Sequence, residues 1–169
     1  MRERLEYAAG WLLLKLLGSV PRSMARAIGV LVANGLFFIR APLRRVAEFN
    51  LRLAFPELPK PARRDILRRM VRNLGWLAAE FAHLPRYNRS NIEKIIILDG
   101  LENFEAAERR GKGVLFLTGH MGAWELEPYA HAVYRRPIYF LVRPIDNPSV
   151  DALVNRYRCA SGNQPIKKN

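Results

Sequence analysis

The sequence predicts an α/β protein with a long helical region at its N-terminus. Residues 62–82 place apolar side chains every three or four positions, which is the spacing of one helix face. Beyond residue 90, short apolar runs alternate with helical segments, and this pattern is typical of an α/β sandwich with a largely parallel sheet. The chain has 169 residues, half of them hydrophobic (50%), so it is long enough to form a folded core.

Two apolar stretches, residues 7–20 and 27–39, flank a basic PRSMAR segment near the N-terminus. Each is shorter than the ~20 residues that a helix needs to cross a bilayer, and Pro21 separates them. This arrangement predicts two helices that lie in or dip into one membrane leaflet, with their flanking arginines among lipid phosphates. Two alternatives remain open: a soluble helical hairpin that covers the core, and a single tilted span.

The formal net charge of +13 is unevenly distributed. Residues 1–90 contain 17 Lys and Arg against 6 Asp and Glu (+11), whereas residues 91–169 contain 11 against 9 (+2). A basic region can contact nucleic acid or an anionic membrane surface, and the neighbouring apolar stretches favour the membrane, so no nucleic-acid partner is expected. Cys159 is the single cysteine, which excludes an internal disulfide and fits a reducing compartment. It has no partner for a metal site, and none is predicted.

The remaining elements are predicted from apolar runs bounded by proline and glycine. Residues 43–54 are predicted as an arginine-rich helix that ends before a proline-rich linker, and residues 62–82 as a long helix. Strands are predicted at residues 95–98, 114–118 and 138–142, helices at 101–110, 124–134 and 148–158, and a further strand near the end.

The segment TGHMGAWE contains the residues most suited to chemistry. His120 follows the predicted strand 114–118, and Glu125 lies five positions later, one turn into the predicted helix. An imidazole beside a carboxylate can take a proton from a hydroxyl nucleophile, and Gly119 and Gly122 would let a substrate approach the backbone. The alternative is a structural corner in which His120 only caps the helix.

The chain resembles a known family at this point. The His-x4-Glu motif in TGHMGAWE, the block LVRPIDNPSVDALVNRYRCASGNQPI and the upstream segment RVAEFNLRLAFPELPKPARRDILRRMVRNLGWLAAE are similar to the lysophospholipid acyltransferase superfamily. Within it, the sequence resembles the bacterial lipid A biosynthesis acyltransferases of the lauroyl/myristoyl type, a group that includes mycobacterial phosphatidylinositol mannoside acyltransferases. The resemblance extends from about residue 40 to the end of the chain.

This resemblance implies a fold and a domain organisation. The fold would be an α/β sandwich like that of glycerolphosphate acyltransferases, preceded by membrane-associating helices in residues 1–41. Residues 42–169 would be the acyltransferase domain, with a helical part at 42–90 and an α/β catalytic part at 91–169. The family's chains are nearly twice as long, and their later motifs have no counterpart here. We therefore expect a C-terminally incomplete acyltransferase. The missing part bears on whether this chain is active by itself, and not on the assignment of its site residues.

The resemblance also assigns roles to individual residues. His120 would be the general base, and Glu125 would orient its imidazole and stabilise the imidazolium. Arg143, which follows the strand 138–142, would contact a phosphate of the acceptor or donor. An ion pair of Arg143 with Asp146 or Asp151 is the alternative. The remaining substrate-binding residues would be Gly122, Asn147 and Arg156.

The implied activity is transfer of a fatty acyl group to a hydroxyl of a lipid A precursor or related glycolipid. The donor would be a thioester of acyl-carrier protein or coenzyme A, and no bound cofactor is expected. The protein would act at the cytoplasmic face of the bacterial inner membrane, on anionic lipid. Phosphatidylinositol mannoside or lysophospholipid acylation is the alternative activity, and an inactive membrane-binding fragment is the noncatalytic alternative.

Overall fold

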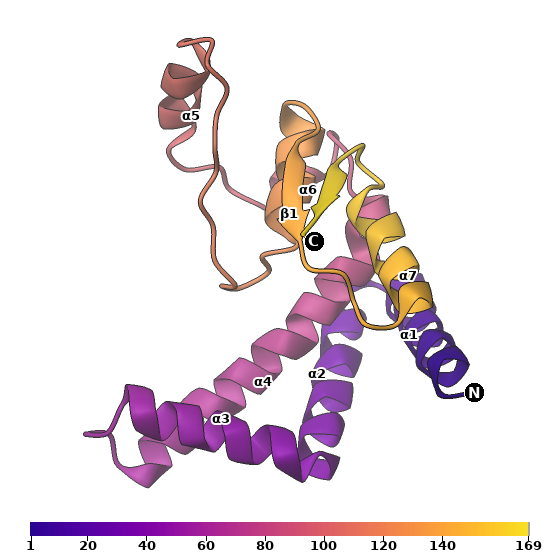
Figure 1. The fold of residues 1–169 in the computed structure, drawn as a ribbon, viewed down its shortest axis with the longest axis vertical. Helices are drawn as coiled ribbons and strands as arrows, with labels where there is room; N and C mark the ends of the chain where they lie inside the picture. Colours follow the sequence, from indigo (N-terminus) through magenta and orange to yellow (C-terminus); the bar gives the residue numbers. More distant parts are fainter. Residues whose placement is uncertain (169) are drawn as a thin grey trace.

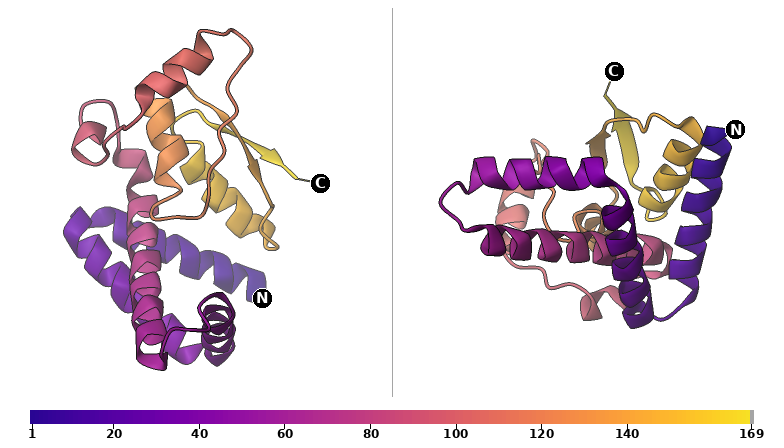
Figure 2. Two further views of the ribbon diagram at one scale, coloured as in Figure 1. Left: turned by 90° about the vertical axis from the view of Figure 1, so that its left-hand side faces the viewer. Right: turned by 90° about the horizontal axis from the view of Figure 1, so that it is seen from below.

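A computed structural model describes residues 1–168. The first half of the chain forms long helices, and the second half forms shorter helices with a small sheet (Figure 1). The helices of the first half are α1 (Arg2–Ser19), α2 (Arg22–Ile39), α3 (Ala41–Ala54) and α4 (Lys60–His83). Helix α4 crosses α1 and α2 and connects this helical part to the rest of the molecule. In a second view, α3 runs alongside the first half of α4 (Figure 2).

The second half begins with two short 3-10 helices and continues into a mixed α/β segment. The β1 and β2 strands pair in parallel, with Tyr139 opposite Gln164 and Val142 opposite Lys167. Helix α7 connects these two strands, which is the crossover that a parallel pair requires. The elements in chain order are η1 (Leu84–Arg86), η2 (Ile92–Lys94), α5 (Leu101–Glu108), α6 (Leu126–Tyr134), β1 (Tyr139–Val142), α7 (Pro148–Arg158) and β2 (Gln164–Lys167).

Two glycines allow α2 and α4 to pack with their backbones in direct contact. A Cβ added to Gly75 would lie 2.6 Å from the Cα of Val30, and one added to Gly29 would overlap the carbonyl oxygen of Gly75. No larger residue fits at either position unless the helices separate. The close approach therefore fixes the position of α2 on α4.

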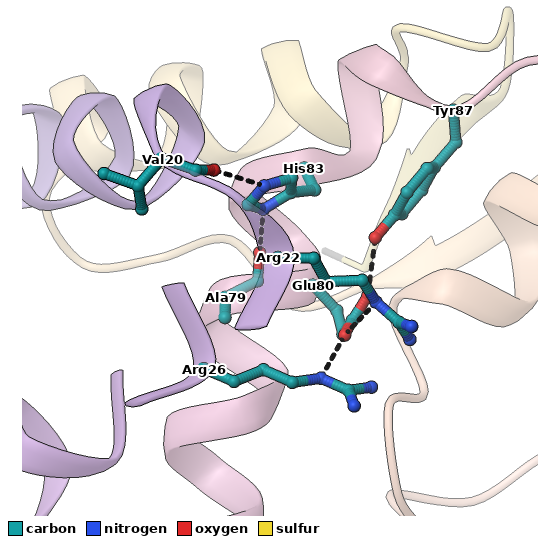
Figure 3. A network of polar contacts seen from close by, with 7 residues as sticks. All are labelled: Val20, Arg22, Arg26, Ala79, Glu80, His83 and Tyr87. Carbon is teal, nitrogen blue, oxygen red and sulfur yellow. Dashed lines mark hydrogen bonds and ion pairs between the residues drawn. The ribbon is translucent and has the colours of Figure 1, made fainter. Parts of the chain in front are cut away.

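A buried polar network also joins α2 to α4 (Figure 3). The Glu80 side chain, which is 2% exposed, accepts hydrogen bonds from Nε of Arg22 (2.9 Å), Nε of Arg26 (2.7 Å) and the hydroxyl of Tyr87 (2.6 Å). Burial alone would raise the pKa of Glu80, but the Tyr87 bond and the two guanidinium groups outweigh it and hold the pKa below its usual value. The carboxylate is thus buried in its charged form with its oxygens paired.

His83 ends α4 and connects it to the turn between α1 and α2. Its Nδ1 lies 2.8 Å from the carbonyl oxygen of Ala79, and its Nε2 lies 3.1 Å from that of Val20 (Figure 3). The ring is 4% exposed. His83 therefore belongs to the packing of the helical part.

The apolar core has two connected clusters, both built on the C-terminal half of α4. The first lies between α1, α2 and α4 and contains Leu17, Ala25, Ala79 and Ala82. The second connects the end of α4 to α6 and contains Phe81, Leu84, Tyr87, Ile92, Leu126, Tyr129 and Ala130. This second cluster supports α6, which begins directly after Glu125.

The sheet is smaller than the sequence pattern suggested. The helix predictions are confirmed to within a few residues, as are the strand at residues 138–142 and the parallel arrangement. The strand predictions for residues 95–98 and 114–118 are wrong, because within residues 1–168 these segments have no strand partner. Ile97 is 93% exposed and Leu117 fully exposed. An apolar run becomes a strand only where neighbouring strands accept its hydrogen bonds.

Helix α2 is the one helix in residues 1–168 whose length and apolar composition would allow it to cross a membrane. Only 11% of it is buried. Its exposed apolar side chains include Leu31, Phe38 and Ile39. The two helices predicted from the N-terminal stretches are present, and Pro21 separates them as expected.

Candidate functional site

His120 lies on an extended segment between α5 and α6. Figure 1 shows this segment running beside the body of the molecule rather than within it. The imidazole is exposed, and its ring packs edge-on against Trp124 with 5.1 Å between the ring centroids. Gly122 turns the chain after His120 with φ of +57°, a left-handed conformation that favours glycine. The turn brings His120 and Glu125 onto one short loop.

Glu125 is held by Arg158 of α7. The Nε of Arg158 lies 2.9 Å from Oε2 of Glu125, and its Nη2 lies 2.5 Å from Oε1. The Glu125 side chain is only 15% exposed, and the Arg158 side chain is 18% exposed. A guanidinium that contacts both oxygens of a carboxylate fixes its orientation. Glu125 is therefore positioned from across the fold, and not only by its own loop.

The predicted contact between His120 and Glu125 is not formed in this structure. Within residues 1–168, no hydrogen bond connects the imidazole to the carboxylate, whose two oxygens both face Arg158. The structure thus places the two residues on one loop without bringing their functional atoms together. Catalytic hydrogen bonds can be long or absent in a protein without its substrate, so their relation as a dyad stays a prediction.

Arg143 follows β1, as predicted, and its side chain is 85% exposed. Its closest acidic partner is Asp146, with 3.7 Å between Nη2 and Oδ1, a long and solvent-exposed contact. Asp151 is not its partner, because that carboxylate accepts hydrogen bonds from the Ile145 amide at 3.1 Å and from Nζ of Lys167 at 3.0 Å. Arg143 is therefore accessible to an anionic ligand, as is the exposed Arg156.

Asn147 has a structural position. Its Oδ1 accepts hydrogen bonds from the backbone amides of Ser149 (3.0 Å) and Val150 (3.3 Å), which caps the N-terminus of α7. Its Nδ2 donates to the carbonyl oxygen of Glu3 (2.9 Å) and to Oε2 of Glu6 (3.0 Å) on α1. Asn147 is 6% exposed, and these contacts occupy its amide. It joins α1 to α7 and shapes the turn that carries Arg143.

Two other polar residues near the loop are engaged elsewhere. Glu127, the nearest alternative carboxylate, accepts a 2.6 Å hydrogen bond from the hydroxyl of Thr118. His131 packs edge-on against the rings of Phe104 and Phe116, which stack on each other, and contacts the carbonyl oxygen of Arg136 through Nδ1 at 3.1 Å. Burial lowers the pKa of His131, which keeps its ring neutral. These contacts give His131 a structural role.

Sequence reasoning did not find the role of Arg158. The sequence places it among the arginines of α7, and its separation of 33 positions from Glu125 leaves no local signal of their pairing. No group of three or more metal-ligating side chains exists within residues 1–168. The arrangement places an exposed imidazole on the same loop as a carboxylate that Arg158 holds through both oxygens.

Comparisons with known proteins agree with the motif. The family model described as bacterial lipid A biosynthesis acyltransferase matches residues 2–169. A lipid A biosynthesis acyltransferase of Haemophilus influenzae is 29% identical over 126 residues, which is 73% of this chain and 39% of the relative. The lipid A biosynthesis palmitoleoyltransferase of Escherichia coli is 25% identical over 124 residues, covering 73% and 40%. The chain thus matches about two fifths of these relatives' length. No solved structure matches it significantly.

Proposed function

The chain belongs to the bacterial lipid A biosynthesis acyltransferase family, and from this premise we propose that it provides the His120 site of an O-acyltransferase. The acyl group would move from a thioester of acyl-carrier protein or coenzyme A to a hydroxyl of a lipid A precursor or related glycolipid. The observation that carries the proposal is the position of Glu125, which Arg158 fixes five residues after an exposed histidine.

In this proposal His120 removes the proton from the acceptor hydroxyl as its oxygen attacks the thioester carbonyl. The carbon–sulfur bond then breaks, and the thiolate takes the proton back from the imidazolium. Glu125 stabilises the imidazolium, which requires the imidazole to approach the carboxylate when substrate binds. Arg158 holds the carboxylate in a fixed orientation for that approach. Arg143 and Arg156 are exposed and available to bind substrate phosphates.

We also propose that the protein acts at the cytoplasmic face of the bacterial inner membrane, with residues 1–41 as the membrane-associating part and residues 42–169 as part of the acyltransferase domain. Large exposed apolar side chains on α1 and α2 support this: Leu5, Leu12, Leu16, Leu31, Phe38 and Ile39. Large exposed apolar patches are rare on monomeric soluble proteins and often mark contact with a membrane or a partner. The β1–β2 pair would form part of a larger α/β sandwich in a chain of the relatives' length.

The test is acyl transfer from a radiolabelled acyl thioester to a lipid A precursor and a panel of lysolipids. It uses this chain and a version extended at its C-terminus to the length of its relatives. In whichever protein is active, His120→Ala should lower transfer by at least about 100-fold, the usual effect of losing a general base. Glu125→Gln should also lower it, whereas the matched change Glu127→Gln should not. Undiminished transfer in His120→Ala would refute the proposed base.

A further inference from the structure

A cationic groove lies between α3 and the first turns of α4, and we define it as the α3–α4 groove. It encloses about 290 Å³, which is close to the lower limit of roughly 300 Å³ for ligand pockets. Four cationic side chains line it, Arg52, Lys60, Arg63 and Arg64, together with one carboxylate, Glu48. At neutral pH the lining therefore carries a net charge of +3 (four minus one).

This positive charge is not balanced by the protein. Within residues 1–168, Arg52, Lys60 and Arg64 form no ion pair, and Arg63 donates to the backbone carbonyls of Phe55 and Leu58. Helix α4 begins at Lys60 with no acidic residue in its first turn. Cations near the positive end of a helix dipole destabilise it. Several cations gathered in one concave place are thus unfavourable unless an anion binds there.

The surface next to the groove indicates the source of that anion. Leu43, Val46, Phe49 and Leu53 follow one another at intervals of three and four along α3, and each is more than half exposed. Arg52 is three positions from Phe49, so the apolar stripe and the groove are neighbours on the helix surface. An apolar stripe beside arginines is the pattern of a helix that lies in a membrane interface, with its cations level with the lipid phosphates.

We propose that the α3–α4 groove binds the phosphate of an anionic phospholipid headgroup. Guanidinium groups suit this ligand because their planar forks hold two phosphate oxygens at once. The start of α4, which lines the groove, lies at the opposite end of that helix from α6 and the sheet (Figure 1). No residue of the His120 loop lines the groove, so the two sites are separate. The proposal goes beyond acyl transfer, since it assigns the α3–α4 pair a role in holding the protein on the membrane.

Co-sedimentation with phosphatidylglycerol vesicles tests this site, with phosphatidylcholine vesicles as the uncharged reference. The groove variant is Arg52→Gln with Arg64→Gln. The control variant is Arg45→Gln with Arg68→Gln, which removes one exposed arginine from each of the same helices but leaves the groove lining intact. The groove variant should bind phosphatidylglycerol vesicles about 30-fold more weakly, corresponding to two lost cations. The control should lose clearly less, because Arg45 and Arg68 do not line the groove.

Equal losses in the two variants would overturn the proposal, because they would show general attraction between charges rather than a site. An unchanged affinity of the groove variant would overturn it as well.

Thermal unfolding with inorganic phosphate identifies the source of the anion. Stabilisation of the wild type by phosphate, without preference for phosphatidylglycerol vesicles, would refute a lipid ligand. If the groove variant does not fold, Arg52→Lys with Arg64→Lys keeps the charge and should still weaken vesicle binding severalfold, because lysine cannot bind phosphate bidentately.

Discussion

Arg158 holds the carboxylate of Glu125 through both of its oxygens, although 33 positions separate the two residues. Arg158 belongs to α7, the helix that connects the two parallel strands, and Glu125 directly precedes α6. The pair therefore couples the geometry of the His120 loop to the packing of α7. A change in α7 that moved Arg158 would also move the carboxylate proposed to act with His120.

Arg158→Met should destabilise the protein by about 3 kcal/mol, because it leaves a mostly buried carboxylate without its counter-charge. Adding Glu125→Gln should recover part of this loss, since the buried charge is then absent. Urea unfolding followed by circular dichroism measures both effects. Arg156→Met is the matched control on the same helix, and it should change stability by less than about 0.5 kcal/mol, because Arg156 is exposed. Strictly additive effects of Arg158→Met and Glu125→Gln would show that the Arg158–Glu125 pair contributes no coupling energy.

Gly75→Ala should destabilise the protein by more than about 3 kcal/mol, because the new methyl group would overlap the backbone of α2 at Val30. Gly29→Ala should have a similar effect from the other side of the contact. Gly35 lies on the same helix as Gly29 but has nothing within 4 Å of an added Cβ. Gly35→Ala should therefore be neutral or stabilise by up to about 1 kcal/mol. Equal midpoints of urea unfolding for Gly35→Ala and Gly75→Ala would contradict the close helix contact.

Glu80 should make the protein sensitive to acid. Its pKa is lower when folded than when unfolded, so its contribution to stability is fully present above the unfolded pKa of about 4.3 and is lost as pH falls through the folded value. Urea unfolding between about pH 7 and pH 3 should show a steeper loss of stability in the wild type than in Glu80→Gln. At neutral pH, Glu80→Gln should be the less stable protein, because Arg22 and Arg26 lose their charged partner. Asp151 also has a lowered pKa, chiefly because it accepts a hydrogen bond from the Ile145 amide, but it is present in both proteins. Parallel pH profiles would show that Glu80 does not control the acid response.

Limited digestion with chymotrypsin should first cut the chain between Leu115 and Leu117. This segment is extended and exposed, and no strand within residues 1–168 pairs with it. Proteases cut preferentially where the backbone is accessible and free of secondary structure. Mass spectrometry of the first fragments identifies the cut. Early cleavage at the buried Tyr87 or Tyr129 instead would indicate that the second core cluster opens before this segment is reached.

Elements with strong local signals could be predicted from the sequence. Helix α7 begins and ends at the predicted residues, since Asn147 is a favoured N-cap and Pro148 suits the first helical position. Pro21 likewise separates α1 from α2 as expected. In each case the residues that decide the boundary lie within one turn of it.

Features that depend on distant residues could not be predicted. Residues 114–118 have the composition of a buried strand, but a strand forms only with partners, and a local pattern does not contain them. The pairing of Arg158 with Glu125 gives no periodic signal either, because α7 and the His120 loop meet only after the chain folds. The position of His120 after an apolar run was predicted, whereas the group that orients Glu125 was not.

The contact between Gly29 and Gly75 limits what α2 can do at a membrane. To cross a bilayer alone, α2 would have to leave α4, and Glu80 would then lose both arginines that keep it charged below the protein surface. Helix α4 cannot follow into hydrocarbon, because its first half carries several arginines. Insertion of α2 and assembly of the helical part are therefore competing outcomes for the same segment. During synthesis, the order in which α2 meets lipid or α4 would decide which of the two the chain adopts.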